Sequence, residues 1–193
     1  MALSIQYEIP TWNQIYDMLL TQAQKIQTQP YKPDTIIAIA RGGLIPARIL
    51  DDLLETTQFA LLQIEFYMDI AQTKQEPTLK QAPTASVLDK NVLLVDDIAD
   101  TGKSLQLAKT LLQQQGAVEI KTVTLYHNPQ SIIKPDFYGK ETSSWVVFPW
   151  ETKETLRRIM QKHVGKRQLN QEIAKLVKAG FPKQLAAKLL KEM

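Results

Sequence analysis

The sequence predicts an α/β fold with a mostly parallel, twisted sheet flanked by helices. The runs Thr35–Ala40 and Asn91–Val95 are rich in aliphatic residues, as is typical of strands buried on both faces. Between residues 11 and 148, strand patterns alternate with segments whose apolar residues have helical spacing. The residues after 150 have helical patterns only, which adds a C-terminal helical hairpin.

The first half of the chain alternates helix and strand. Thr11 and Gln14 have capping-box spacing ahead of a helical pattern, and Pro46 is tolerated in the first turn of a second helix. The predicted elements are a helix over 11–28, a strand over 35–40, a helix over 44–55 and a strand over 59–66. Residues 67–89 have no apolar period and contain three threonines and two prolines. They predict a long mobile loop, and such loops in compact domains are usually functional.

The second half ends in helices. The predicted elements are strands over 91–95, 120–126 and 145–148, and helices over 102–115, 151–163, 170–179 and from Pro182 onward. Gly116 and Gly180 end two of these helices. We predict a domain over residues 1–163 and a basic helical extension over 164–193. The apolar stripe of this extension must pack on the body of the protein or on a partner subunit.

Composition narrows the class of protein. The chain has no cysteine, which excludes disulfides and thiolate metal sites but not a metal with oxygen ligands. The N-terminus lacks a signal-peptide pattern and no apolar stretch reaches membrane-spanning length, so we expect a cytoplasmic protein. Residues 153–193 hold 11 Lys or Arg and 3 Asp or Glu, which we interpret as solvated helix faces and not as a nucleic-acid site.

The strongest chemical feature follows the strand over 91–95. Asp96 and Asp97 come directly after it, and Asp100-Thr101-Gly102-Lys103-Ser104 then begins a helix. In open parallel sheets, ligands bind beyond the carboxyl ends of the strands. A helix N-terminus with a glycine and hydroxyls binds anions, while adjacent carboxylates can accept hydrogen bonds from vicinal hydroxyls. The pattern therefore predicts a sugar-phosphate site.

A second anion-binding feature follows the strand over 35–40. Arg41-Gly42-Gly43 offers a bidentate phosphate donor and two residues whose backbone can approach an anion closely. Alone, this tripeptide is a weak signal. At the end of a neighbouring parallel strand, it predicts a second phosphate-binding loop beside the first.

Val92–Ser104 resembles the phosphoribosyl-pyrophosphate motif of the type I phosphoribosyltransferases, and the resemblance covers about residues 30–151. It implies that Asp96 and Asp97 bind the ribose and that residues 100–104 bind the 5′-phosphate. Arg41-Gly42-Gly43 resembles the pyrophosphate-binding loop of that family, which often has a cis peptide before the basic residue. Asp100 followed by Thr-Gly resembles the 6-oxopurine enzymes, in which this carboxylate takes part in proton transfer with the base.

The segment Trp145–Glu151 resembles the base-binding segment of the xanthine-guanine and archaeal purine enzymes. The resemblance implies that Trp145 stacks on the base, with core packing as the alternative role. It also implies that the Val146 backbone bonds the base edge and that Glu151 lies near magnesium, directly or through water. The metal would otherwise be held mainly by substrate. In the loop over 67–89, Lys74 and Tyr67 are candidates for pyrophosphate contact.

One position departs from the family pattern. Related enzymes commonly have a lysine before Pro129 that donates to the 6-oxygen of the base, and here Asn128 takes that place. An ammonium can only donate, whereas an amide can donate or accept. The base-binding Asn128 therefore admits adenine as an alternative to hypoxanthine, guanine or xanthine.

The resemblance implies a purine phosphoribosyltransferase of purine salvage that depends on magnesium and forms a homodimer or higher homo-oligomer. Its partners would be a purine base, phosphoribosyl pyrophosphate and a nucleoside monophosphate, with no membrane and no nucleic acid. One alternative is a nucleic-acid-binding regulator that senses phosphoribosyl pyrophosphate on the same fold, supported by the basic tail. Another is an orotate enzyme, against which Asp100 and Trp145 argue.

Overall fold

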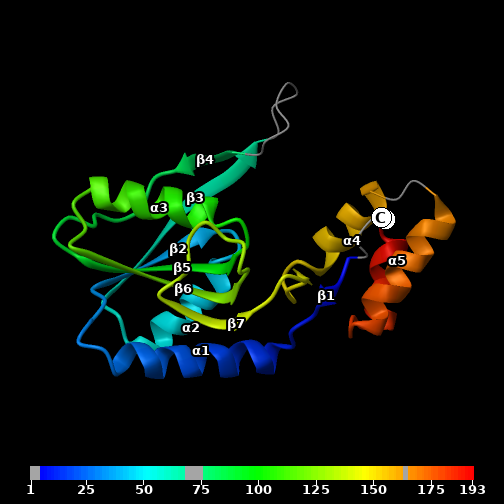
Figure 1. Ribbon diagram of the computed structural model, residues 1–193, viewed down its shortest axis with the longest axis horizontal. Helices are drawn as coiled ribbons and strands as arrows, with labels where there is room; N and C mark the ends of the chain where they lie inside the picture. Colours follow the sequence, from blue (N-terminus) through cyan, green and yellow to red (C-terminus); the bar gives the residue numbers. More distant parts are fainter. Residues whose placement is uncertain (1–4, 68–75, 163–164) are drawn as a thin grey trace. The chain divides into compact units, whose positions relative to one another are not determined.

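The computed structural model describes residues 5–67, 76–162 and 165–193 (Figure 1). The chain divides into two compact units. One is Tyr16–Ser143, and the other combines Met1–Ile15 with Ser144–Met193. Among the described residues, no helix is long and apolar enough to cross a membrane.

A six-stranded sheet forms the centre of the unit Tyr16–Ser143. Its strand order is β4-β3-β2-β5-β6-β7, and every neighbouring pair is parallel except β3 and the edge strand β4. The strands are β2 (Thr35–Ala40), β3 (Gln58–Tyr67), β4 (Glu76–Gln81), β5 (Asn91–Ala99), β6 (Glu119–His127) and β7 (Phe137–Glu141). This mostly parallel sheet confirms the predicted fold class.

Helices cover both faces of this sheet. α3 (Lys103–Gln114) lies on one face, and α2 (Leu44–Leu54) lies on the other with the part of α1 (Trp12–Gln27) that belongs to this unit (Figure 1). The residues of α3 that face the sheet, Leu105, Ala108 and Leu112, are buried in one apolar cluster with strand residues such as Leu94. β2 is buried along its whole length, as expected for a strand covered on both faces.

The strand order reverses between β2 and β5. β2 leads through α2 to β3 on one side, whereas β5 leads through α3 to β6 on the other side. The two helices therefore lie on opposite faces of the sheet, and the region beyond the carboxyl ends of β2 and β5, where the two connections diverge, is the topological switch point, termed the crevice below. Ligands of open α/β sheets bind at such a point. The loop of residues 41–43 follows the end of β2, and the turn of residues 100–104 follows the end of β5.

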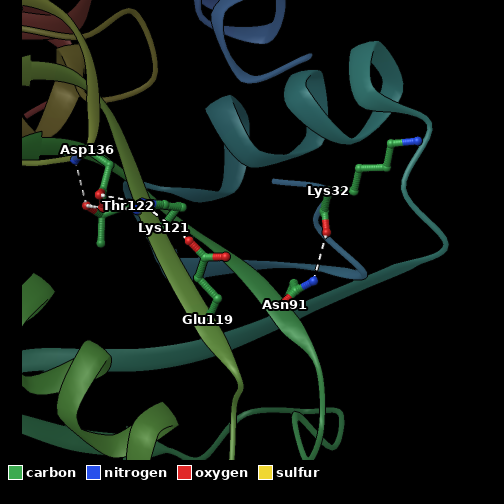
Figure 2. Close-up of polar contacts among 6 residues, drawn as sticks. All are labelled: Lys32, Asn91, Glu119, Lys121, Thr122 and Asp136. Atoms are coloured by element: carbon green, nitrogen blue, oxygen red, sulfur yellow. Dashed lines mark hydrogen bonds and ion pairs between the residues drawn. The ribbon is translucent and has the colours of Figure 1, made fainter. Parts of the chain in front are cut away.

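Polar contacts stabilise the sheet near the starts of β5 and β7 (Figure 2). Asp136 Oδ2 accepts hydrogen bonds from the Thr122 backbone N–H and hydroxyl, both at 2.8 Å, and the Thr122 hydroxyl accepts one from the Asp136 N–H. The Asn91 side chain donates to the Lys32 carbonyl at the start of β5. These contacts hold the connections that begin β5 and β7 and lie away from the crevice.

The second unit joins the two ends of the chain. β1 (Tyr7–Glu8) pairs in parallel with β8 (Trp145–Val146), and three helices follow, α4 (Thr152–Lys162), α5 (Lys166–Lys178) and α6 (Lys183–Lys191). Residues of α4, α5, α6 and the segment after β8 share one buried cluster: Val147, Leu156, Ile159, Leu176, Phe181 and Ala186. The apolar stripe of the C-terminal helices is thus buried within this unit. The boundary between residues 163 and 164 stays a prediction.

Several sequence-based expectations require correction. The segment 67–89, predicted as a loop, contains β4, an antiparallel edge strand. Its polar residues and Pro77 gave no strand pattern in the sequence, because an edge strand depends on backbone pairing more than on an apolar face. β5 does not end at Val95 but continues to Ala99 along β6, so the two aspartates lie inside a strand. β1 and β7 were not predicted, and the strand predicted over 145–148 spans only Trp145–Val146.

Candidate active site

Asp97 and the glycine loop after β2 meet at the crevice. β2 pairs with β5 only as far as Ala38 and Val95, and the next residues of β5 run past the end of this pairing. Asp97 is buried, at 6 % exposure, and a Cβ on Gly42 would lie 2.6 Å from its Oδ1. A side chain at this position would displace the carboxylate, so glycine lets the loop and Asp97 pack together without such a shift.

Arg41 is the exposed cation of this loop, and the Ala40–Arg41 peptide is cis, as the resemblance implied. Gly43 is buried, and a Cβ there would lie 2.8 Å from the Ile39 carbonyl oxygen. The loop therefore packs its backbone directly against the sheet. That packing leaves the guanidinium as its exposed charged group.

The turn before α3 has the form of an anion site. Gly102 has a φ of 77° and precedes the first residue of α3. The first N–H groups of a helix have no partner within it, and the positive end of the helix dipole lies there. The Thr101 hydroxyl accepts a long hydrogen bond from the Lys103 N–H at 3.4 Å, and Ser104 is half-buried one residue later. The turn thus presents N–H groups and hydroxyls together.

A second loop supports this turn. Ile132 N–H donates to the Thr101 carbonyl at 3.0 Å, and a Cβ on Gly102 would collide with the Ser131 hydroxyl and lie 2.8 Å from Ile133 Cγ2. Sequence reasoning missed residues 131–133. Their only signal was their position after β6, whose carboxyl end neighbours that of β5.

Asn128 is hydrogen-bonded to Asp100. Its Nδ2 donates to Asp100 Oδ1 at 2.8 Å, and its Oδ1 accepts the Gln130 backbone N–H at 3.0 Å. The backbone N–H can only donate, so it fixes which end of the amide is oxygen. The NH2 group is therefore held toward Asp100, and the predicted free choice between donor and acceptor is restricted.

Lys103 differs from the simple expectation of a phosphate-binding lysine. Its ammonium lies 2.7 Å from Glu76 Oε1 of β4, so its charge faces the edge hairpin. The contribution of Lys103 to a phosphate site is therefore its backbone position in the first turn of α3, and not its ammonium group. Lys74 lies outside the described residues, and for Tyr67 the structure describes only its place at the end of β3.

The predicted base-binding residues lie in the other unit. Trp145 is half-buried, and its ring centroid lies 6.0 Å from that of Tyr7, with the planes 37° apart. The N–H groups of Trp145 and Val147 donate to the Gln6 and Glu8 carbonyls. Because successive strand residues direct their backbone groups to alternate sides, Val146 presents its N–H and C=O on the side away from β1.

Glu151 is half-buried at the start of α4, where its carbonyl accepts the Thr155 N–H at 2.8 Å. In the part of the chain that the structure describes, no three acidic or histidine side chains gather into a cluster that could hold a metal. Protein side chains alone therefore form no closed cation cage there. A hard cation would need oxygen ligands from substrate.

Comparison with known proteins identifies the family. A family model described as a phosphoribosyl transferase domain matches residues 8–155. The chain belongs to this family. The phosphoribosyltransferase match ends within α4, so α5 and α6 lie beyond it.

Individual relatives agree with this assignment. The chain is 32% identical over 153 residues to a xanthine-guanine phosphoribosyltransferase of Gluconobacter oxydans, covering 77% of this chain and 87% of the relative. It is 27% identical to a hypoxanthine-guanine phosphoribosyltransferase of Schizosaccharomyces pombe, covering 75% and 88% of the two chains. A solved purine phosphoribosyltransferase from Pyrococcus horikoshii is 35% identical with a TM-score of 0.69, covering 76% and 94%. The predicted family and fold are confirmed.

Proposed function

We propose that this protein transfers the phosphoribosyl group of phosphoribosyl pyrophosphate to a 6-oxopurine in purine salvage, releasing pyrophosphate. The observation that supports this most directly is the crevice between β2 and β5. There, the glycine loop lies against Asp97 and the turn at Gly102 begins α3. The similarity to enzymes named for xanthine, guanine and hypoxanthine supports the choice of base.

In this reaction, the bond from the anomeric carbon to pyrophosphate oxygen breaks and a bond to a purine nitrogen forms. The leaving pyrophosphate takes the electron pair of the broken bond, and Arg41 lies in the loop proposed to receive its charge. Asp96 and Asp97 would accept hydrogen bonds from the ribose hydroxyls, and residues 100–104 would hold the 5′-phosphate. Holding the sugar in this way supplies orientation to the reaction.

The base nitrogen that attacks must also lose a proton, and Asp100 is the proposed acceptor. Asn128 donates to the same carboxylate, which orients it. Since the Gln130 N–H holds the amide oxygen of Asn128 on its own side, the NH2 group is the end that faces Asp100, and its second hydrogen makes Asn128 a donor there. A donor suits a 6-oxygen and disfavours the amino group of adenine.

Magnesium is the proposed cofactor. The adjacent carboxylates of Asp96 and Asp97, of which Asp97 is buried, suit a hard cation that shares its ligands with substrate oxygens. Glu151 is a further candidate, through water. When bound, magnesium would neutralise charge on the leaving pyrophosphate. We further propose that the protein forms a homodimer or higher homo-oligomer in the cytoplasm. It binds neither nucleic acid nor a membrane in this proposal.

The test is a turnover assay with phosphoribosyl pyrophosphate, magnesium and a panel of hypoxanthine, guanine, xanthine and adenine. We expect turnover with at least one 6-oxopurine and a lower kcat/KM with adenine. Turnover with adenine alone would contradict the assignment of the base. Absence of turnover with all four would contradict the function.

A matched pair of variants connects this activity to the crevice. Gly42→Ala places a methyl group against the Asp97 carboxylate and should abolish most turnover, because loop or carboxylate must move. Gly165→Ala is the control, since the nearest atom of the described residues, Gln168 Oε1, would lie 3.9 Å from its Cβ. Equal turnover of the two variants would move the site away from the crevice.

A further inference from the structure

The C-terminal helices and the predicted base-binding segment share one core. Trp145 and Tyr7 pack against the cluster formed by α4, α5 and α6, together with apolar residues of α5 and α6 such as Leu169 and Leu189. The family match ends at residue 155, so most of these helical contacts come from residues outside it. Most of the residues that pack in this cluster with Trp145 thus belong to the part of the chain that the family match does not include.

Tyr7 directly links the predicted base-binding segment to the C-terminal helices. It lies opposite Trp145 in the pairing of β1 with β8, and the two rings are in contact range at 6.0 Å between centroids. Its hydroxyl donates to Glu172 Oε1 of α5 at 2.7 Å. This hydrogen bond therefore connects α5 to the ring that packs on Trp145.

Glu172 is built into the core and is not a surface charge. It is 5 % exposed, and its Oε2 receives the Lys175 ammonium at 2.9 Å. Burial and the neighbouring Glu172 carboxylate raise the pKa of Tyr7 above its usual value, so the phenol keeps its proton and stays the donor at neutral pH. A buried carboxylate is costly without its donors, which fixes the position of the Tyr7 ring.

We infer that Glu172 is a positioning residue for the purine base. It holds Tyr7, Tyr7 holds the indole of Trp145, and the C-terminal hairpin thereby sets the surface on which the base stacks. The inference rests on the proposed function, because it assigns Trp145 to the base. It places a specificity-determining contact in α5, outside the residues that match the family.

The test compares Tyr7→Phe, Glu172→Ala and Glu172→Gln in the full-length protein, with the purine that the wild type uses best. Tyr7→Phe and Glu172→Ala should raise KM for the base roughly ten-fold, the effect of losing one charge-assisted hydrogen bond. KM for phosphoribosyl pyrophosphate and kcat should change less than about two-fold, because the residues proposed to bind the sugar belong to the unit Tyr16–Ser143, whereas Tyr7 and Glu172 do not. Glu172→Gln keeps an oxygen that accepts from Tyr7 and should restore most of the affinity.

Two controls match these variants. Glu192→Gln removes a carboxylate of the same unit that pairs with Lys153 at 45 % exposure, and Tyr16→Phe removes an exposed phenol. Both should leave KM for the base unchanged. An unchanged KM for the base in Tyr7→Phe and Glu172→Ala would overturn the inference, as would an equal rise in KM for both substrates. A wild type without purine turnover would overturn the proposed function and the inference with it.

Discussion

Asp100 and Asn128 form the most informative residue pair of the site. Asp100 is exposed at the end of β5, and Asn128 follows β6, whose last residue pairs with Ala99. The 2.8 Å hydrogen bond between their side chains forms because the ends of these two strands are neighbours in the sheet. Asn128 is therefore placed to orient the carboxylate proposed to accept the proton of the base.

Replacing Asn128 by alanine should reduce kcat roughly ten- to a hundred-fold, because Asp100 loses a charge-assisted hydrogen bond of about 1.5–3 kcal/mol. KM for phosphoribosyl pyrophosphate should stay near its wild-type value. Steady-state kinetics check both. Asn91→Ala is the matched control, since its side chain bonds the Lys32 carbonyl at the other end of β5 (Figure 2). An unchanged kcat in Asn128→Ala would remove Asn128 from the chemistry.

Asp96→Asn and Asp97→Asn should each weaken ribose binding, by about 1.5–3 kcal/mol for each charge-assisted hydrogen bond lost. The variants should fold, because the amide keeps the size of the carboxylate. kcat/KM for phosphoribosyl pyrophosphate measures the loss and circular dichroism monitors the fold. Near-normal kinetics in both variants would exclude the two carboxylates from the site.

At the scale of elements, the turn between α5 and α6 shows how the C-terminal hairpin closes. Gly180 has a φ of 116°, its N–H donates to the Val177 carbonyl, and the Phe181 N–H donates to the Leu176 carbonyl. This is a Schellman ending, in which the residue after the helix adopts a left-handed conformation. It directs Phe181, at 2 % exposure, into the core of the unit.

Gly180→Ala should therefore destabilise the folded protein by about 1–2 kcal/mol. Within the described part of the chain, a Cβ there would have no heavy atom within 4 Å, so the cost is conformational and not steric. Urea unfolding measures the change. Gly165→Ala, at the other end of α5 with a φ of −99°, should be neutral or stabilising by up to about 1 kcal/mol. A neutral Gly180→Ala would contradict the left-handed assignment.

At the scale of the whole molecule, the site is assembled from connections far apart in the sequence. The glycine loop, the turn before α3 and the loop after β6 follow three strands that are neighbours in the order β2-β5-β6. The turn before α3, which is proposed to bind phosphate, packs through Gly102 against Ser131 and Ile133. Binding of a phosphorylated ligand should consequently stabilise the folded chain as a whole.

A nucleoside monophosphate at about 100 times its Kd should stabilise the protein by about 2.7 kcal/mol and raise Tm by roughly 5–10 °C. Gly102→Ala should lose this shift, because its Cβ would collide with Ser131 and lie 2.8 Å from Ile133 Cγ2. Thermal melts of both proteins with and without ligand give the measurement. The same Tm shift in Gly102→Ala would place the phosphate elsewhere.

The sequence by itself determined the buried strands, the helices, the family and the glycine turn that begins α3. These depend on local patterns, namely aliphatic runs, helical spacing and a glycine before a helix. It failed at β4 and β7, whose polar residues pair through the backbone and have no apolar period.

Only the tertiary structure decided that Asn128 pairs with Asp100, that Lys103 pairs with Glu76, and that Glu172 holds Tyr7. Each of these contacts joins residues at least 27 positions apart. Their partners are chosen by the order of strands and by the packing of the chain ends. A pattern of neighbouring residues cannot contain that information, because it is set by the long-range pairing of the backbone.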